Sequence, residues 1–245
     1  MNEDSLLFVD TKESLIINQT DVYFSAREVE GDFLCLVSDG MGGHASGEIA
    51  SHVVCDEFKK WFELLPEKVL QFSEDLISAL SVKFLEIDRF INQEITTESR
   101  SPGATVVGIL FLQTLGTFIF HAGDSRAYRR KGEILQQYTQ DHNDYQMRVQ
   151  NGLPADDLVH LGLTNCLGAG GKDNFLEVKN FESKSGEFNS WILCSDGIHG
   201  FLNQDELEEL TSEKEAKLGF ISLKERLDQK YESPDNYSII TIYQD

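Results

Sequence analysis

Short apolar segments separated by polar turns open the chain. Apolar runs of about four to eight residues bounded by polar turn residues are typical of β-strands. The pattern therefore predicts a run of short strands at Leu6–Val9, Leu15–Ile17, Val22–Ser25 and Phe33–Val37.

Two segments with helical spacing follow these strands. The pattern turns helical from Glu48 to Leu64, and apolar side chains then recur every three or four residues. We interpret this recurring stripe as core packing rather than a binding face; it comprises Leu76, Leu80, Phe84, Ile87 and Ile91.

Strand patterns return after the helices. They are predicted at Thr105–Leu112, Thr117–His121, Arg126–Arg130 and Ile134–Gln137, with Lys131-Gly132 as a hairpin turn. Residues 143–173 are rich in Gly, Asn and Asp and are interpreted as a mobile loop or flap. Further strands are expected at 175–181, 190–194 and Tyr237–Tyr243, and helices near 203–210 and 213–230.

This order of elements favours an α+β fold. Strands come in runs that are interrupted by helices, which indicates antiparallel sheets with segregated helices rather than a repeated strand–helix–strand unit. The length of 245 residues is enough for one domain with a substantial core, and we expect a single domain over residues 1–245.

Composition excludes several classes of protein. A net charge of −21 argues against nucleic acid and anionic membranes as partners, because phosphate groups require clustered Lys and Arg. No apolar run approaches the roughly 20 residues that span a bilayer. Glu3 and Asp4 stand where a signal peptide would carry positive charge, so we expect a cytoplasmic protein. The four cysteines form no Cys-x-x-Cys pair and are expected to be buried free thiols.

Candidate chemistry begins with two segments in which an apolar strand ends in Asp-Gly. Asp39-Gly40 follows one strand, with further glycines at 42 and 43, and Asp196-Gly197 follows another. Carboxylates and a backbone carbonyl are the ligands that hard divalent cations take. We interpret the two segments as two sides of one acidic site.

Other acids lie in turns. Asp124 stands in HAGDSRAY, Asp141 in TQDHN and Asp235 in SPDN. Taken singly, an aspartate in a turn is more often part of an Asx turn or a helix cap than a metal ligand. Their order along the chain, together with PGATV at 102–106, changes that interpretation.

With these motifs the chain resembles the metal-dependent serine/threonine protein phosphatases of the type 2C (PPM) family, in their compact bacterial form. The resemblance is carried by SDGMGGHASGEIAS, PGATV, AGDSRAY, TQDHN, LTNCLG, LCSDG and DNYSIITI, and runs from about residue 6 to the last strand. It implies a four-layer αββα sandwich of two antiparallel sheets flanked by helices.

The resemblance also implies roles for single residues. Asp39 would bridge two Mn²⁺ or Mg²⁺ ions, with the Gly40 carbonyl as a further ligand, and Asp196 and Asp235 would complete the first ion. Asp124 would help to hold a third, weaker ion, with Asp196 shared. Asp39 and Asp196 would then be the catalytic acids. The implied reaction is hydrolysis of phosphoserine or phosphothreonine by a water that bridges two metals, without a phosphoenzyme.

The ligand that precedes Asp39 has two candidates. The family carries Arg-x-x-Asn-(Glu or Gln)-Asp here. Asn2-Glu3-Asp4 matches literally but lies too far ahead of Asp39 for the usual layout. Asn18-Gln19-Thr20-Asp21 has the usual spacing, so we take Asp21 as the second-metal ligand and the earlier match as fortuitous.

That choice places the family's phosphate-binding arginine at Ile16 and its Glu or Gln at Thr20. Arginine binds phosphate in a bidentate manner that isoleucine does not replace. Lys12, Arg27 and Arg148 are the candidate substitutes; Arg148 is also the single candidate for contacting substrate.

Histidines are assigned supporting roles. His44 follows Gly42-Gly43, but the family's acid histidine follows Asp-Gly directly, and that position is Met41. We therefore interpret His44 as structural, His142 as hydrogen-bonded and His121 as part of the core.

The resemblance implies a phosphorylated protein as substrate, an opposing serine/threonine kinase, and a role in signalling; we expect a monomer. The alternative, motivated by Ile16 and Thr20, is a catalytically weak phosphatase-like module that binds or senses phosphoproteins.

Overall fold

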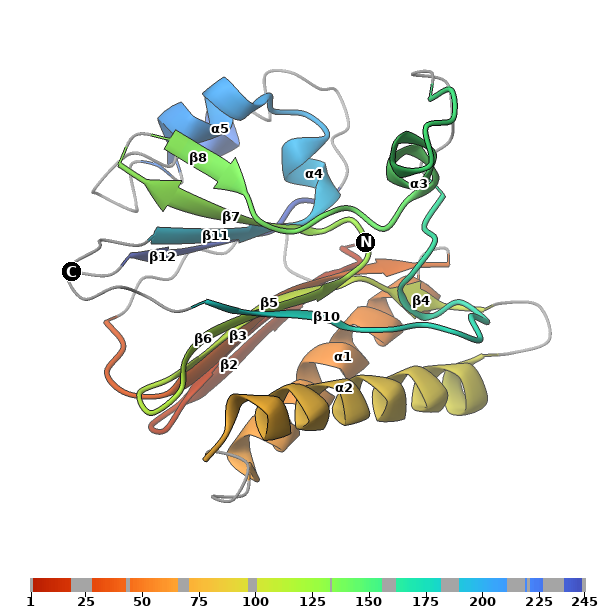
Figure 1. Ribbon diagram of the computed structural model, residues 1–245, viewed down its shortest axis with the longest axis vertical. Coiled ribbons are helices and arrows are strands. Elements are labelled where there is room, and N and C mark those ends of the chain that lie inside the picture. The colour runs from red at the N-terminus through yellow and green to blue at the C-terminus, as the bar shows by residue number, and fades with distance from the viewer. Residues whose placement is uncertain are drawn as a thin grey trace.

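The computed structural model describes residues 2–18, 28–42, 45–65, 71–96, 101–132, 134–155, 162–181, 190–210, 219, 221–226 and 236–243. Within them the chain forms two antiparallel sheets that lie face to face (Figure 1). The larger sheet has the strand order β10-β6-β5-β3-β1-β2, and the smaller one has the order β12-β11-β7-β8.

Strands of the larger sheet come from both halves of the described chain. They are β1 (Asp4–Asp10), β2 (Ser14–Asn18), β3 (Phe33–Met41), β5 (Val106–Leu112), β6 (Gly116–Ala122) and β10 (Glu177–Phe181), with β4 (Gly103–Ala104) and β9 (Leu167–Gly168) extending the end of β3. The smaller sheet contains β7 (Arg126–Lys131), β8 (Ile134–Gln137), β11 (Ser190–Cys194) and β12 (Ile239–Tyr243).

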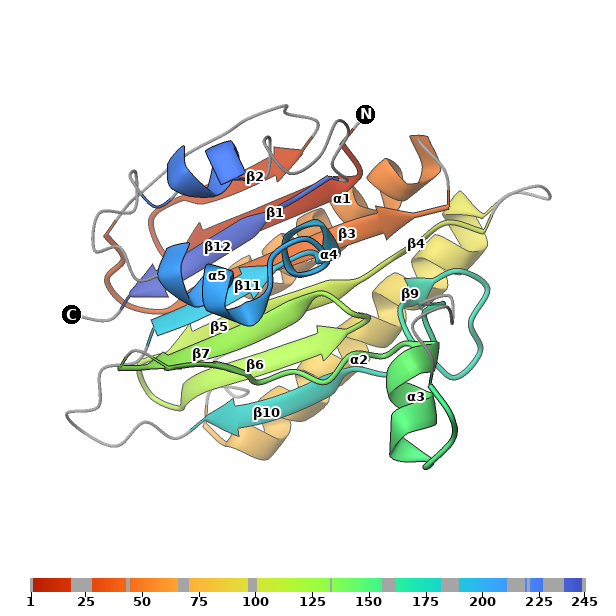
Figure 2. The same ribbon diagram turned by 90° about the horizontal axis from the view of Figure 1, so that it is seen from above.

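Helices cover the outer face of each sheet. Figure 1 shows α1 (Ala45–Glu63) and α2 (Ser73–Phe90) below the larger sheet, and α4 (Asp196–His199) and α5 (Gln204–Leu210) above the smaller one. A π-helix, Ile91–Ile95, continues α2. Viewed from above, the smaller sheet lies over the larger one (Figure 2). The expected αββα sandwich is confirmed.

Strand β3 shows why the sandwich forms. Leu34 and Leu36 belong to the core between the larger sheet and its helices, whereas Cys35 and Val37 belong to the core between the two sheets. Successive side chains of a strand point to opposite faces, so this continuous apolar run is buried on both sides. A third core, around Ile198, joins the smaller sheet to its helices.

Predicted and observed elements agree over most of the described residues. The helix predicted near 213–230 lies largely outside them, and the short helix α4 was not predicted. Residues 143–173 were expected to be irregular, but the described part contains α3 (Asp144–Gln150) as well as β9. The side chain of Asn143 accepts a hydrogen bond from Gln146 N (2.9 Å), which caps the first turn of α3. The strand predicted at Val22–Ser25 lies outside the described residues.

Two expectations from composition can also be compared with the structure. All four cysteines are free and buried, as predicted. Among the helices that the structure describes, none combines the length and the apolar character needed to cross a membrane.

Gly108 illustrates how closely the larger sheet packs. It lies in β5 opposite Phe120 of β6, and a Cβ atom at this position would overlap the Phe120 ring. Phe120 is fully buried and packs on Phe58 of α1, with ring centroids 5.4 Å apart. The ring therefore occupies the space that the missing side chain leaves.

Gly108→Ala is expected to lower the free energy of unfolding by about 1–3 kcal/mol, because a methyl group forced into a filled core displaces its neighbours. Denaturant unfolding measures this loss. In a Phe120→Leu background the same substitution should cost less, since the ring atoms that it meets are gone. Strictly additive effects of the two substitutions would contradict this packing account.

Candidate metal centre

Asp39 is held through its backbone at the end of β3. Its N–H donates to Oγ1 of Thr105 (3.0 Å), and its carbonyl accepts from the N–H of Thr105 (2.8 Å). The Thr105 hydroxyl also contacts the hydroxyl of Ser125 (2.7 Å), next to Asp124. These contacts use the backbone of Asp39 and leave its carboxyl group to the site.

Asp4 lies directly opposite Asp39. The two residues pair across the antiparallel strands β1 and β3, and Asp4 is almost fully buried. The hydroxyl of Ser195 donates to Oδ2 of Asp4 (2.8 Å) and accepts from the N–H of Ser238 (3.0 Å). Strand pairing therefore places Asp4 beside Asp39, so Asn2-Glu3-Asp4 is a structurally supported candidate for the ligand that precedes Asp39, beside Asp21.

The same pairing changes the interpretation of Ile16. Strand β2 lies outside β1, and Ile16 pairs with Leu7 and packs against the core. The assignment of the family's arginine position to Ile16 depended on the register with Asp21, and the observed strand order does not support that register. Asp21 itself lies outside the described residues.

Asp196 enters the site from the smaller sheet. It is the first residue of α4, directly after β11. A Cβ atom on the following Gly197 would overlap the carbonyl oxygen of Asn236, so this glycine permits the close approach of the segment before β12. Asn236 in turn accepts a hydrogen bond from Glu3 N (2.7 Å). The expected ligand Asp235 is the neighbour of Asn236 but lies outside the described residues.

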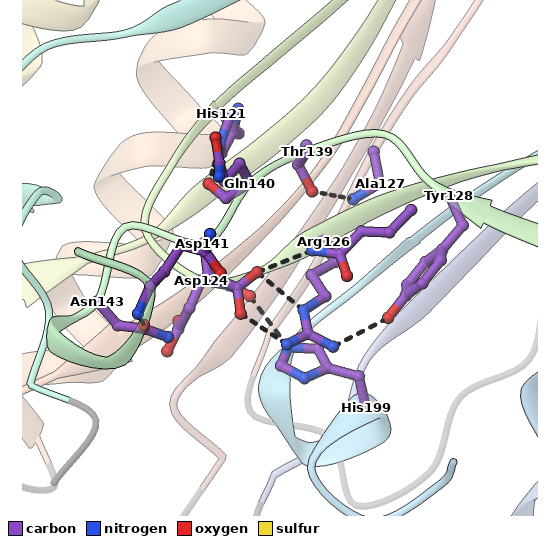
Figure 3. Close-up of polar contacts among 12 residues, drawn as sticks. His121, Asp124, Arg126, Ala127, Tyr128, Thr139, Gln140, Asp141, Asn143 and His199 are labelled. Carbon is purple, nitrogen blue, oxygen red and sulfur yellow. Dashed lines mark hydrogen bonds and ion pairs between the residues drawn. The ribbon is translucent and has the colours of Figure 1, made fainter. Parts of the chain in front are cut away.

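Asp124 occupies the turn between β6 and β7, where the chain passes from the larger sheet to the smaller one. Its carbonyl accepts from Nε2 of His199 (3.0 Å). Beside it, Arg126 donates to both carboxylate oxygens of Asp141, from Nε (2.8 Å) and Nη2 (2.6 Å). Figure 3 shows the ion pair of Arg126 and Asp141 close to Asp124, with the Tyr128 hydroxyl bonded to the same guanidinium group. Both carboxylate oxygens of Asp141 are thus paired with Arg126.

The negative charges of the acids raise one another's pKa values. Burial, followed by the charges of Asp4, Asp196 and Asp124, raises the pKa of Asp39 well above its ordinary value. Burial raises the pKa of Asp4 to about 6, although hydrogen bonds from Ser195 and Ser238 act in the opposite direction. Burial, with the charges of Asp196 and Asp141, raises the pKa of Asp124 to about 7. Four carboxyl groups from separate segments therefore converge on one place.

This arrangement fits divalent cations. Oδ1 of Asp4 is buried and has no hydrogen-bond partner among the described residues. In the same part of the chain, no lysine or arginine forms an ion pair with Asp4, Asp39 or Asp124. Buried carboxylates require a counter-charge, and all-oxygen donors suit Mn²⁺ or Mg²⁺.

Comparison with known proteins decides the family. The chain matches the protein phosphatase 2C family over residues 16–230. The chain belongs to this family. Its match begins after Asp4, so the placement of Asp4 rests on the strand pairing alone.

Individual relatives agree with this assignment. The serine/threonine phosphatase stp of Listeria monocytogenes serotype 4b is 27% identical over 230 residues, which cover 86% of this chain and 84% of the relative. Among solved structures, the S. agalactiae serine/threonine phosphatase has a TM-score of 0.76 at 18% identity, covering 98% of this chain and 92% of its own. The catalytic domain of the serine/threonine phosphatase PstP, solved in complex with 2 manganese ions, has a TM-score of 0.66 at 23% identity and covers 99% and 100%. At these identities the two structures show the fold.

Gly40 lies where the family's carbonyl ligand is expected, directly after Asp39. A Cβ atom on Gly40 would overlap the carbonyl of Gly47 in α1 and would lie 2.8 Å from the carbonyl of Glu3. Gly40 N also donates to that Glu3 carbonyl (3.2 Å). Only glycine allows β1, β3 and the start of α1 to meet this closely.

The remaining candidates are placed as follows. Lys12 lies beyond Asp10, at the opposite end of β1 from Asp4, and pairs with Glu30 (3.6 Å). This position excludes it as a phosphate-binding substitute. Arg148 lies on α3 and donates to the carbonyl of Pro154 (3.3 Å). His44 and Arg27 lie outside the described residues.

Sequence reasoning did not single out the residues that hold the acids in place. Thr105 and Ser195 stand inside the motifs PGATV and LCSDG, and their place in these motifs was the signal that could have identified them. His199 had no such signal, because its contact with Asp124 joins segments that are distant in the sequence.

Without metal, the stability of this family member is expected to fall as the pH rises from about 4 to about 7. The folded protein keeps protons on Asp4 and Asp124 that the unfolded chain releases near 3.8, so the folded state binds more protons in this window. Asp4→Asn removes one such carboxylate, while its amide oxygen can still accept from Ser195. In chelator, we expect it to raise the Tm at pH 7 by roughly 2–4 °C and to change little at pH 4.

Thermal unfolding across this pH range provides the measurement. Asp173→Asn, at an exposed position, is the control for the loss of one negative charge. Parallel Tm profiles for the wild type and Asp4→Asn would show that the Asp4 carboxylate carries no such penalty.

Proposed function

We infer that this member of the protein phosphatase 2C family hydrolyses phosphoserine and phosphothreonine in proteins and depends on divalent cations for the reaction. One observation carries the inference: Asp4, Asp39, Asp124 and Asp196 converge from separate motifs on one buried place, where a carboxylate oxygen has no hydrogen-bond partner among the described residues. The family match and the stp relative support the reaction class.

We propose that Asp39, Gly40, Asp196 and Asp235 hold two Mn²⁺ or Mg²⁺ ions, with Asp4 in the place that sequence spacing assigned to Asp21. Asp124 would help Asp196 to hold a third ion. When bound, such ions lower the pKa of a water molecule, screen the charge of the phosphoryl group and orient the phosphate. The PstP domain with two manganese ions supports the choice of metal for a protein of this fold.

The chain's own residues supply position and charge. Asp39 is central among the acids, since its pKa responds to Asp4, Asp196 and Asp124 together. Thr105 fixes its backbone from the larger sheet, and Ser195 fixes the Asp4 carboxylate from the smaller one. The acids are therefore held in place before any cation arrives, which reduces the rearrangement that binding requires.

Substrate and partners follow from the reaction class. We propose a phosphorylated protein as substrate and a serine/threonine kinase as the opposing enzyme, with the protein acting as a cytoplasmic monomer in one domain. The segment 143–173, which includes α3, is proposed to act as the flap that influences which phosphoproteins reach the acids, with Arg148 as its candidate contact.

Asp39→Asn is expected to lower the Mn²⁺-dependent hydrolysis of an aryl phosphate ester by at least roughly 10³-fold, because it removes the acid on which the charges of Asp4, Asp196 and Asp124 all act. Phosphate release with excess Mn²⁺ measures the effect. Wild-type turnover that does not exceed that of Asp39→Asn would refute the enzymatic function.

Asp4 and Asp21 can be compared by calorimetry. We expect Asp4→Ala to weaken the binding of Mn²⁺ by about tenfold or more, because Asp4 lies beside Asp39, and we expect Asp21→Ala to bind Mn²⁺ nearly as the wild type does. The opposite ranking would restore the register that sequence spacing suggested.

The phosphoprotein-binding module is not favoured. Its motive was the assignment of the arginine position to Ile16, and the observed strand order does not support that assignment. A phosphopeptide that is retained but not cleaved in the presence of Mn²⁺ would revive it.

A further inference from the structure

The turn that carries Asp124 is held by two histidines from different parts of the chain. We propose that His142 and His199 are positioning residues for Asp124, that each acts through one particular ring nitrogen, and that together they set the affinity of the weakest cation site. The inference rests on the proposed function, because it assigns Asp124 to a cation.

His142 holds the residue before Asp124. Its backbone N–H donates to the carbonyl of Gly123 (3.0 Å), and the N–H of Gly123 donates to Nδ1 of the ring (3.2 Å). Gly123 has a φ of +113°, and a Cβ atom there would lie 2.7 Å from Cβ of Thr105. Both polar backbone groups of this tight turn therefore depend on His142.

The ring of His142 has one tautomer available. Its Nδ1 also accepts from the side-chain amide of Asn165 (2.9 Å). The orientation of that amide is set by Phe175, whose N–H donates to Oδ1 (3.0 Å) and whose carbonyl accepts from Nδ2 (2.9 Å). Since Nδ1 faces two donors, the proton of the neutral ring must reside on Nε2, which lies 3.5 Å from Glu177.

This arrangement argues against a separate metal site at His121, His142 and Glu177, although their donor atoms lie within 4.8 Å of one another. The two imidazole rings stack, with centroids 4.5 Å apart and planes inclined by 13°. A metal ion lies in the plane of each ring that binds it, about 2 Å from the nitrogen, so parallel stacked rings do not share one ion. The cluster supports the ring of His142 instead.

His199 holds Asp124 itself. Its Nε2 donates to the carbonyl of Asp124 (3.0 Å), as Figure 3 shows. Because a carbonyl oxygen can only accept a hydrogen bond, Nε2 of His199 must carry the proton of the ring. His199 is the last residue of the helix that begins with Asp196. One hydrogen bond thus connects the two acids that are assigned to the third ion.

Besides these two contacts, the hydroxyl of Ser125 ties the turn to Thr105 (2.7 Å). Asp124 lies where the chain crosses from β6 in the larger sheet to β7 in the smaller one. A shift between the sheets would move its carboxyl group relative to Asp39 and Asp196. Residues that orient metal ligands commonly change metal affinity by roughly 10- to 100-fold when they are replaced.

Because the two histidines use different nitrogens, isosteric amides give opposite results at the two positions. The amide of asparagine reaches the place of Nδ1, and that of glutamine reaches the place of Nε2. We expect His142→Asn and His199→Gln to keep the weakest Mn²⁺ affinity within about threefold of the wild type. We expect His142→Gln and His199→Asn to weaken it by roughly tenfold.

Calorimetric titration of the full chain with Mn²⁺ gives the Kd of the weakest binding step, and thermal unfolding in chelator verifies that each variant folds. Asp124→Asn, which removes the carboxylate, marks which step belongs to this site. His52→Ala is the control for the loss of a histidine, because His52 contacts Asn18 and lies on α1.

The crossed pattern at either position supports the inference, so one variant that fails to fold does not end the test. Equal effects of asparagine and glutamine at both positions, or no effect of any variant, would overturn it. If the wild type hydrolyses phosphate esters with Mn²⁺ but shows no crossed pattern, only this inference fails. If the wild type neither binds Mn²⁺ nor turns over, the proposed function fails as well.

Discussion

Mutual repulsion of buried carboxylates is the constraint on which the site depends. Asp4, Asp39, Asp124 and Asp196 perturb one another, and burial raises the pKa of the first three. Bringing such groups together costs free energy unless a counter-charge or a proton compensates. The fold holds them mainly through backbone atoms and hydroxyl groups, as Thr105 does for Asp39 and Ser195 for Asp4. Such contacts fix positions without neutralising the negative charge.

Both sheets together fix the positions of the acids at this site. Ser195 follows β11 of the smaller sheet and bonds to Asp4 of the larger one, and Asn236, before β12, bonds to Glu3. The core between the sheets, which includes Val37 of β3 and Leu193 of β11, fixes their separation. Because no single sheet contains all the acids, the site exists only when the sandwich is packed. Folding and metal binding are therefore linked.

Sequence patterns located most elements, and they drew attention to Asp39 and Asp196 because a strand end followed by Asp-Gly is a local signal. For the ligand before Asp39 they favoured Asp21, which lies outside the described residues, over Asp4. Distance along the chain suggested Asp21, but the pairing of β1 with β3 is a long-range contact, and the hairpin to β2 separates the two strands in sequence without separating them in space. They also missed α3, a helix of 7 residues with no buried side chain, whose start depends on the cap at Asn143. Apolar periodicity cannot report a helix that buries no face.

The net charge of the whole chain, together with the acid cluster, affects how the protein can bind a phosphate group. At a net charge of −21, the protein as a whole repels a phosphate dianion, and four acids at the candidate site add to that repulsion. Arg126 does not reverse the local charge, because Asp141 accepts both arms of its guanidinium group. Under the proposed function, the attraction for phosphate would then come from cations bound by these acids. In this protein the ions would be required for binding the substrate as well as for the reaction, so occupancy of the cation sites would govern both KM and kcat.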